Sequence, residues 1–263
     1  MPSKREQRVP RDFVGSVRHA LAVLSSFDKD NSEMTLSSVS ARTGMTRAGA
    51  RRYLLTLEHL GYLRKDDRLF RLTPKVLELG FAFLSTAPLA EIARPYLQQI
   101  TRETGEIAGL AVLDSDAIVH IAASTVQRTL APTLTIGRRF NALYASTGRA
   151  IAAFLDAAAV EDLLKRCEIA ALTPQSLKTK EEIRAELRAV RRQGYAVVDQ
   201  EVEEGVRSVA VPLLNREGQP LAAITILTNV ATVSRRQLIE EILPLLQRMV
   251  SQIPLQALNS GPR

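Results

Sequence analysis

Apolar residues recur with a helical period at the beginning of the chain. Between residues 13 and 27 they lie three or four positions apart, which predicts an amphipathic helix that ends at the polar run 28–31. The predicted buried stripe consists of Val17, Ala20, Leu21, Leu24 and Phe27. A short helix over residues 36–43 is expected to follow, with Thr35 as its N-cap and Gly44 at its end.

A third helix is predicted between Thr46, which can cap it, and Gly61, which can end it. Its apolar stripe comprises Ala50, Tyr53, Leu54, Leu57 and Leu60. Residues 62–72 then form two short apolar runs around Asp66-Asp67, which predicts a β-hairpin. Three helices followed by a hairpin is the element order of a winged helix-turn-helix, which we place at residues 13–74.

Two helical segments are predicted to connect this domain to the rest of the chain. One begins at Pro74, and the other runs from Pro88 to about Glu103. Because these segments lack the Gly and Ser content of a flexible linker, residues 75–104 are expected to form a rigid helical linker.

A different pattern begins at Gly105. Strands are predicted at 107–114 and 117–124, on either side of a Ser115-Asp116 turn, and at 133–137, 208–214 and 220–228. Helices are predicted at 148–157, about 159–166, about 180–193 and 234–253, the last kinked at Pro244. Together they predict a mixed sheet with helices segregated around it, an α+β domain over residues 105–256.

The excess positive charge of the chain lies entirely in its first third. Residues 1–75 contain 15 Lys/Arg and 8 Asp/Glu, whereas residues 76–263 contain 20 of each. Part of the excess lies in a polar, basic arm at residues 1–12, which carries Lys4, Arg5, Arg8 and Arg11. This asymmetry indicates an acidic polymer or an anionic surface as the partner of the first third, with an idle basic domain as the alternative.

The basic residues of the third helix lie opposite its apolar stripe. Arg51 and Arg52 straddle that face with Ala48 between them, and Arg47 lies on its flank in the first turn. Because Ala48 is small, the helix can approach a major groove, where arginine bonds guanine or phosphate. Double-stranded DNA is therefore the expected partner, in preference to a solvated face paired with Glu58. The expected DNA-binding residues are Thr46, Arg47, Ala48, Arg51 and Arg52 in the helix and Arg64, Lys65 and Arg68 in the hairpin.

The rest of the chain lacks the short motifs of common enzymes. It has no GxSxG, P-loop or dinucleotide fingerprint, and its histidines lack metal-ligand spacing, so we expect no catalytic residue, metal or cofactor. His120 lies in an apolar strand and is expected to be a satisfied structural histidine. No apolar stretch is long enough for a bilayer and Cys167 is the only cysteine, so a cytoplasmic protein without a membrane partner is expected.

Ser146-Thr147-Gly148 directly precedes an apolar helical run. The free N–H groups at the start of a helix and the positive end of its dipole favour a carboxylate ligand there. A simple N-cap explains the same residues, and the residues alone leave both interpretations open.

The first third contains SVRHALAVLSSF, TLSSVSARTGMTRAGARRYLLTLEHLGYL and FRLTPKVLELG, and the remainder contains VLDSDAIVHIA, TIGRRF, ASTGRAIAAFL and RRQGYAVVDQEVEEGVRSVAVPL. These segments, within about residues 13–253, resemble the IclR family of bacterial transcriptional regulators. The resemblance is closest to the branch that controls protocatechuate, 4-hydroxybenzoate and β-ketoadipate catabolism.

The resemblance implies an N-terminal winged-helix DNA-binding domain, a helical linker and a C-terminal effector-binding domain related to GAF/PAS folds. It further implies a homodimer or homotetramer on a palindromic operator, with a small carboxylate, an aromatic or keto acid, as effector. It places the effector site at Ser146, Thr147, Gly148, Asp199, Glu203, Ser208 and Thr225. Asp199 and Glu203 could instead be exposed loop acids. Asn141 and Thr147 depart from the proline and methionine that this branch often has, which leaves the identity of the acid open.

The chain is therefore predicted to be a DNA-binding transcriptional regulator and not an enzyme. One alternative is a redox- or ligand-sensing GAF-like enzyme with a domain for non-specific nucleic-acid attachment, in which Cys167, beside Lys165 and Arg166, is the candidate reactive centre. A second alternative is an architectural nucleic-acid binder that takes no ligand.

Overall fold

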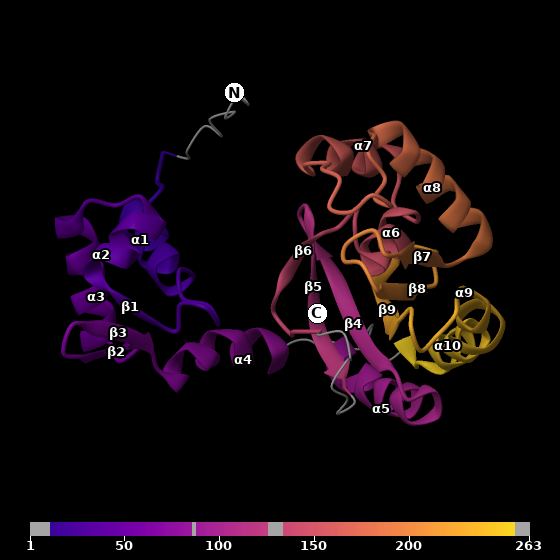
Figure 1. Ribbon diagram of the computed structural model, residues 1–263, viewed down its shortest axis with the longest axis horizontal. Helices are drawn as coiled ribbons and strands as arrows, with labels where there is room; N and C mark the ends of the chain where they lie inside the picture. Colours follow the sequence, from indigo (N-terminus) through magenta and orange to yellow (C-terminus); the bar gives the residue numbers. More distant parts are fainter. Residues whose placement is uncertain (1–10, 86–87, 126–133, 256–263) are drawn as a thin grey trace. The chain divides into compact units, whose positions relative to one another are not determined.

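The computed structural model describes residues 11–85, 88–125 and 134–255 (Figure 1). The chain divides into two compact units, Met1–Phe83 and Leu84–Arg263, and the division falls within the predicted linker. Arm residues Lys4, Arg5 and Arg8 lie outside the described residues.

The first unit contains the three predicted helices, α1 (Gly15–Leu24), α2 (Leu36–Thr43) and α3 (Arg47–His59). Threonine hydroxyls cap α2 and α3 as predicted. Thr35 accepts a hydrogen bond from the Ser38 N–H, and Thr46 accepts one from Gly49 N–H at 3.1 Å. Gly44 ends α2 in the left-handed region at φ 67°, where a residue without Cβ is favoured.

A small antiparallel sheet follows these helices. The predicted hairpin is present as β2 (Leu63–Asp66) and β3 (Leu69–Leu72), with Asp67 in its turn at φ 50°. A third strand, β1 (Glu33–Thr35), pairs with the other side of β3. It was not predicted, because three residues are too few to show an alternating pattern.

The core of the first unit differs from the predicted stripe of α1. Val23 is fully buried, whereas Val17 and Leu21 are 56% and 52% exposed, so their predicted burial is wrong. Leu60 also lies outside the core, while Ala50, Leu54 and Leu57 of α3 are buried as predicted. Only the C-terminal end of α1 packs into the core. The helical period identifies the apolar face of the helix but not how much of its length is covered by other elements.

The linker helices begin with a short 3-10 turn (Pro74–Val76) that continues into α4 (Leu77–Ser85), and α5 (Pro88–Thr104) follows. Their helical character matches the prediction. However, α5 is not a spacer, because it contributes a buried apolar face to the core of the second unit. The buried side chains are Leu89, Ala90, Ala93, Leu97 and Ile100.

The second unit is built on a six-stranded sheet in the order β6-β5-β4-β9-β8-β7. Its strands are β4 (Ile107–Asp114), β5 (Ala117–Ser124), β6 (Arg139–Asn141), β7 (Ala196–Asp199), β8 (Val206–Leu214) and β9 (Pro220–Asn229). All pairings among these strands are antiparallel, so the α+β class is right but the expected mixed sheet is wrong. No strand forms at 134–137, which contain a turn, and Thr133 is outside the described residues. The strand that follows this turn is β6, at Arg139–Asn141.

Helices cover both faces of this sheet (Figure 1). One face carries α6 (Ser146–Ala152), α7 (Ala157–Arg166) and α8 (Lys180–Gln193). The other carries α5, α9 (Arg235–Gln237) and α10 (Leu243–Gln252). The predicted helix 148–157 is shorter, because Asp156 already caps α7 by accepting from the Ala159 N–H at 2.7 Å. The irregularity expected at Pro244 is a π-helical turn, Leu238–Ile242, just before it.

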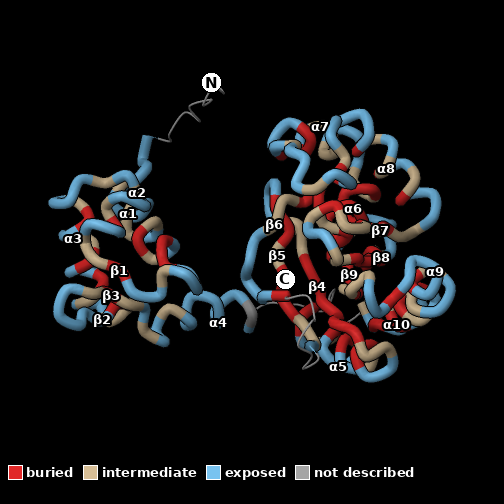
Figure 2. The backbone as a smooth tube through the Cα atoms, viewed as in Figure 1, coloured by how far each residue is buried: buried red, intermediate tan, exposed pale blue. Residues whose placement is uncertain are grey.

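Separate apolar cores lie on the two faces of the sheet. Figure 2 shows long stretches of its central strands as buried. On β4, Leu110 belongs to the core under α5 and α10, whereas Ala111 belongs to the core under α6, α7 and α8. Small residues, such as Ala210 on β8 and Ala223 on β9, line the second of these faces. This alternation decides which predicted site residues can lie together.

Candidate nucleic-acid interface and effector site

Helix α3 presents a basic surface opposite its buried residues. Arg47, Ala48, Arg51 and Arg52 are all exposed, as the predicted orientation requires. Arg64 and Lys65 on β2 and Arg68 after it are exposed as well. Thr46 is exposed, but its hydroxyl is engaged as the N-cap of α3.

Within the described part of the chain, none of these six Arg and Lys side chains forms an ion pair with an acidic residue. Other arginines of the same unit do: Arg42 contacts Asp28 at 2.6 Å, and Arg71 contacts Glu33 at 3.0 Å. The surface pair considered for Glu58 does not form with any of the six. Among the described residues, α3 and the hairpin thus carry a group of six exposed basic side chains whose charge no acidic residue neutralises.

Two of the predicted effector residues, Ser146 on α6 and Thr225 on β9, meet through their hydroxyls. Ser146 and Thr147 at the start of this helix are buried, as is Thr225 on β9. The hydroxyls of Ser146 and Thr225 lie 3.2 Å apart, and Thr225 also donates to the Val209 carbonyl at 3.0 Å. Because α6 has seven residues and no side-chain cap, buried hydroxyls rather than a helix dipole are the main polar groups here.

Gly148 has a packing reason to be glycine. A Cβ at this position would lie 1.9 Å from the carbonyl oxygen of Ala142, well inside van der Waals contact. The residue therefore permits α6 to approach the preceding segment closely.

The other predicted effector residues separate. Ser208 faces the same side of the sheet as Thr225, because it pairs with Leu227, two residues along β9. Asp199 is opposite Arg207 on the other face, and its carboxylate lies 2.9 Å from the Arg207 guanidinium. Glu203 is exposed in the turn before β8. Only part of the predicted set thus lies at one place.

A buried ion pair beside this site was missed from the sequence. The side chain of Arg149 is 0% exposed, and its guanidinium makes a two-pronged contact with Glu201 at 2.9 and 2.6 Å. Arg149 Nε also donates to the Leu143 carbonyl at 2.7 Å. Arg149 and Glu201 are 52 residues apart, so no local pattern could have indicated their contact.

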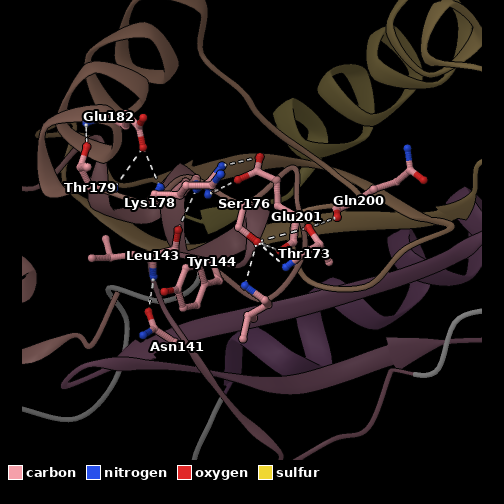
Figure 3. A network of polar contacts seen from close by, with 12 residues as sticks. Asn141, Leu143, Tyr144, Thr173, Ser176, Lys178, Thr179, Glu182, Gln200 and Glu201 are labelled. Atoms are coloured by element: carbon pink, nitrogen blue, oxygen red, sulfur yellow. Dashed lines mark hydrogen bonds and ion pairs between the residues drawn. The ribbon is translucent and has the colours of Figure 1, made fainter. Parts of the chain in front are cut away.

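Hydrogen bonds from side-chain hydroxyls to backbone carbonyls hold the segment around Glu201 in place (Figure 3). Ser176 donates to the Glu201 carbonyl at 2.5 Å, and Thr173 donates to the Gln200 carbonyl at 2.7 Å. Asn141, one of the two departures from the family pattern, accepts from the Leu143 N–H and donates to the Glu168 carbonyl. Its side-chain amide therefore links the segment that precedes α6 to the segment that follows α7.

Cys167 is a poor candidate for a reactive centre. It follows α7, is buried, and lies 3.3 Å from the Asp116 carbonyl, to which its thiol donates. Burial, followed by the negative charge of Asp116, raises the pKa of this thiol, which keeps it protonated. A reactive cysteine needs the opposite shift.

His120 is buried on β5 but does not have the expected partners. Neither ring nitrogen has a hydrogen-bond partner among the described residues, so the prediction of a satisfied histidine is wrong. Its ring lies edge-on to Phe140, with centroids 6.3 Å apart. Burial lowers the pKa of His120 to about 4, so the ring is neutral near pH 7.

No cluster of His, Cys, Asp and Glu in the described ranges could hold a metal ion. Nor is any single helix there both long and apolar enough to cross a membrane; Pro74–Phe83 and Pro88–Thr104 reach that length and composition only when taken together across a break.

Each of the two units matches the model of a known protein family. The model of the IclR helix-turn-helix domain matches residues 16–67, and the model of the bacterial transcriptional regulator IclR C-terminal domain matches residues 81–255. The chain belongs to the IclR family. It is a transcriptional regulator with a helix-turn-helix DNA-binding domain, and its relatives are named as regulators rather than enzymes.

Two relatives in the branch named by the sequence resemblance are similar over nearly the whole chain. The Pca regulon regulatory protein of Pseudomonas putida is 41% identical over 93% of this chain and 85% of its own. The p-hydroxybenzoate hydroxylase transcriptional activator of Acinetobacter baylyi is 30% identical over 96% and 95%. A solved transcriptional-regulator structure from Rhodococcus sp. RHA1 has a TM-score of 0.84 and 36% identity, and the match covers 95% of this chain and 100% of that one. The predicted family and two-domain fold are thereby confirmed.

Proposed function

We propose that this regulator controls genes of aromatic-acid catabolism in the cytoplasm. It binds a palindromic operator as a dimer or tetramer, and a small carboxylate metabolite in the second unit changes its affinity for DNA. The exposed, unpaired basic side chains of α3 and the hairpin carry the DNA-binding part of this proposal. In a two-fold arrangement, two such helices enter successive major grooves of one operator.

Relatives and site chemistry support the effector class. One relative is named for the Pca regulon and another for p-hydroxybenzoate hydroxylase, which points to aromatic acids and their breakdown products. The buried hydroxyls of Ser146, Thr147 and Thr225 offer hydrogen bonds on a side of the sheet that is lined by many small apolar residues. Such sites use a few polar groups to orient a largely apolar ligand.

A thermal-shift series tests the effector class. Protocatechuate, 4-hydroxybenzoate, β-ketoadipate and related acids are added separately to the purified protein. An acid present at 100 times its dissociation constant is expected to stabilise the native state by about 2.7 kcal/mol and to raise the melting temperature measurably. An unchanged melting temperature with every acid contradicts the proposed effector class and favours a nucleic-acid binder without a ligand.

The apolar surface of α4 supports self-association. Leu77 and Phe81 are 72% and 70% exposed, and Leu79 is also exposed, which is unusual for one short helix of a monomer. We expect the Phe81→Glu variant to have a lower molar mass than the wild type by light scattering, because a buried carboxylate would oppose helix association.

Leu172→Glu serves as the matched control, since Leu172 is an exposed leucine outside α4. It is expected to keep the wild-type molar mass. A Phe81→Glu protein with the same mass as the wild type would show that α4 does not hold the oligomer together.

A further inference from the structure

His120 is a buried polar side chain of the second unit that the fold itself does not explain. It is 6% exposed, and both of its ring nitrogens lack hydrogen-bond partners among the described residues. A buried polar group without a partner destabilises the folded state, so its presence calls for an explanation.

The imidazole lies on the same face of the sheet as the buried hydroxyls. His120 pairs with Ala111, and Gly109, two residues earlier on β4, pairs with Thr225. Side chains directly opposite each other, and those two apart on a strand, share one face. His120, Gly109 and Thr225 therefore form a row across β5, β4 and β9, facing α6.

Gly109 lies in the middle of this row, and the side chains of Leu134 and His120 pack over it. A Cβ at Gly109 would lie 3.2 Å from Cδ2 of His120 and 2.4 Å from a methyl carbon of Leu134. The His120 ring thus lies against the backbone of Gly109 on β4, the strand between His120 and Thr225, with Leu134 packed beside it. Because β5 and β9 are two strand spacings apart, roughly 10 Å separates the backbones at the two ends of the row.

The chemistry of the ring suits a ligand with a polar substituent. As a neutral imidazole it carries one N–H donor and one nitrogen acceptor. A ligand hydroxyl can satisfy either of them, whereas an unsubstituted aromatic edge can satisfy neither. A site of this kind discriminates against ligands that lack the hydroxyl, because its buried polar group then stays unpaired.

We propose that His120 is an effector-contacting residue that hydrogen-bonds a hydroxyl of the ligand, at the opposite end of the row from Thr225. This assignment rests on the proposed function and deepens it, because it makes the effector a hydroxylated carboxylic acid. It also gives the unpartnered imidazole a purpose: its buried ring nitrogens are satisfied only when the effector is bound.

The experiment uses His120→Leu, which keeps a similar volume without hydrogen-bonding atoms, and His120→Gln, which keeps a donor and an acceptor. Each full-length variant is titrated calorimetrically with 4-hydroxybenzoate and with benzoate, which differ only in the hydroxyl. Melting temperatures without ligand and affinity for DNA are measured in parallel.

We expect His120→Leu to melt at or above the wild-type temperature without ligand, because the unpaired polar group is gone. Its affinity for 4-hydroxybenzoate is expected to fall roughly tenfold, as for the loss of one buried hydrogen bond, while its affinity for benzoate changes little. His120→Gln is expected to retain part of the preference for the hydroxylated acid.

Two results would overturn the assignment. One is a His120→Leu protein with the wild-type preference for 4-hydroxybenzoate over benzoate. The other is a loss of stability in both variants with the preference unchanged, which would make His120 a structural residue. A wild-type protein that binds neither acid would instead contradict the aromatic effector class, and with it this inference, so the two failures are distinguishable.

Discussion

Replacing Glu201 with alanine is expected to lower the free energy of unfolding by about 3–5 kcal/mol, because it leaves the guanidinium of Arg149 buried without a counter-ion. Arg149 is fully buried, and both of its terminal nitrogens bond Glu201. Urea unfolding followed by circular dichroism measures the change.

The matched control is Glu161→Ala, which removes an exposed carboxylate that also forms a two-pronged contact, with Arg184. Pairs of this exposed kind contribute at most about 1 kcal/mol. The double variant Arg149→Met/Glu201→Leu is expected to be more stable than Glu201→Ala, since it buries no unpaired charge. If Glu201→Ala costs no more than Glu161→Ala, the buried pair does not hold the second unit together.

Replacing Arg51 and Arg52 together with alanine is expected to weaken operator binding by about 2–6 kcal/mol, at about 1–3 kcal/mol for each arginine that contacts a base. Both side chains are exposed on α3, and neither supports the fold through an ion pair among the described residues. The melting temperature and effector affinity should therefore stay at wild-type values. Fluorescence anisotropy with a labelled operator duplex measures the loss.

Arg188→Ala/Arg192→Ala is the matched control, because it removes the same charge from exposed positions of α8 in the second unit. It is expected to change DNA affinity little. Equal losses in the two double variants would mean that overall charge rather than the α3 surface drives binding.

Replacing Arg64 or Lys65 singly with alanine is expected to reduce the slope of log affinity against log salt concentration by about one, because each side chain is expected to contact one phosphate.

The sequence predicted the first unit well where local chemistry decides the structure. Threonine caps, glycine ends and the stripe of Ala50, Leu54 and Leu57 define α2 and α3 without reference to the rest of the molecule. The stripe of α1 failed at Val17 and Leu21, because burial there depends on where neighbouring elements end.

In the second unit, strand alternation showed which residues could share a face but not what lies beside them. Ser146 and Thr225 lie within hydrogen-bonding distance of each other, whereas Asp199 lies on the other face beside Arg207. The Arg149–Glu201 pair and the unpartnered ring of His120 both depend on contacts between distant segments. Such contacts leave no period or motif in one sequence.

The central claim is that one chain binds a specific operator and that an acid in its second unit controls this binding. The most direct test is an anisotropy titration of a duplex selected from a random library by the full-length protein. It is carried out with and without the acid that gives the largest thermal shift. We predict a two-fold symmetric sequence whose affinity exceeds that of a scrambled duplex and changes about 5–150-fold when the acid is added. Equal affinity for selected and scrambled DNA, unaffected by the acid, would contradict the claim.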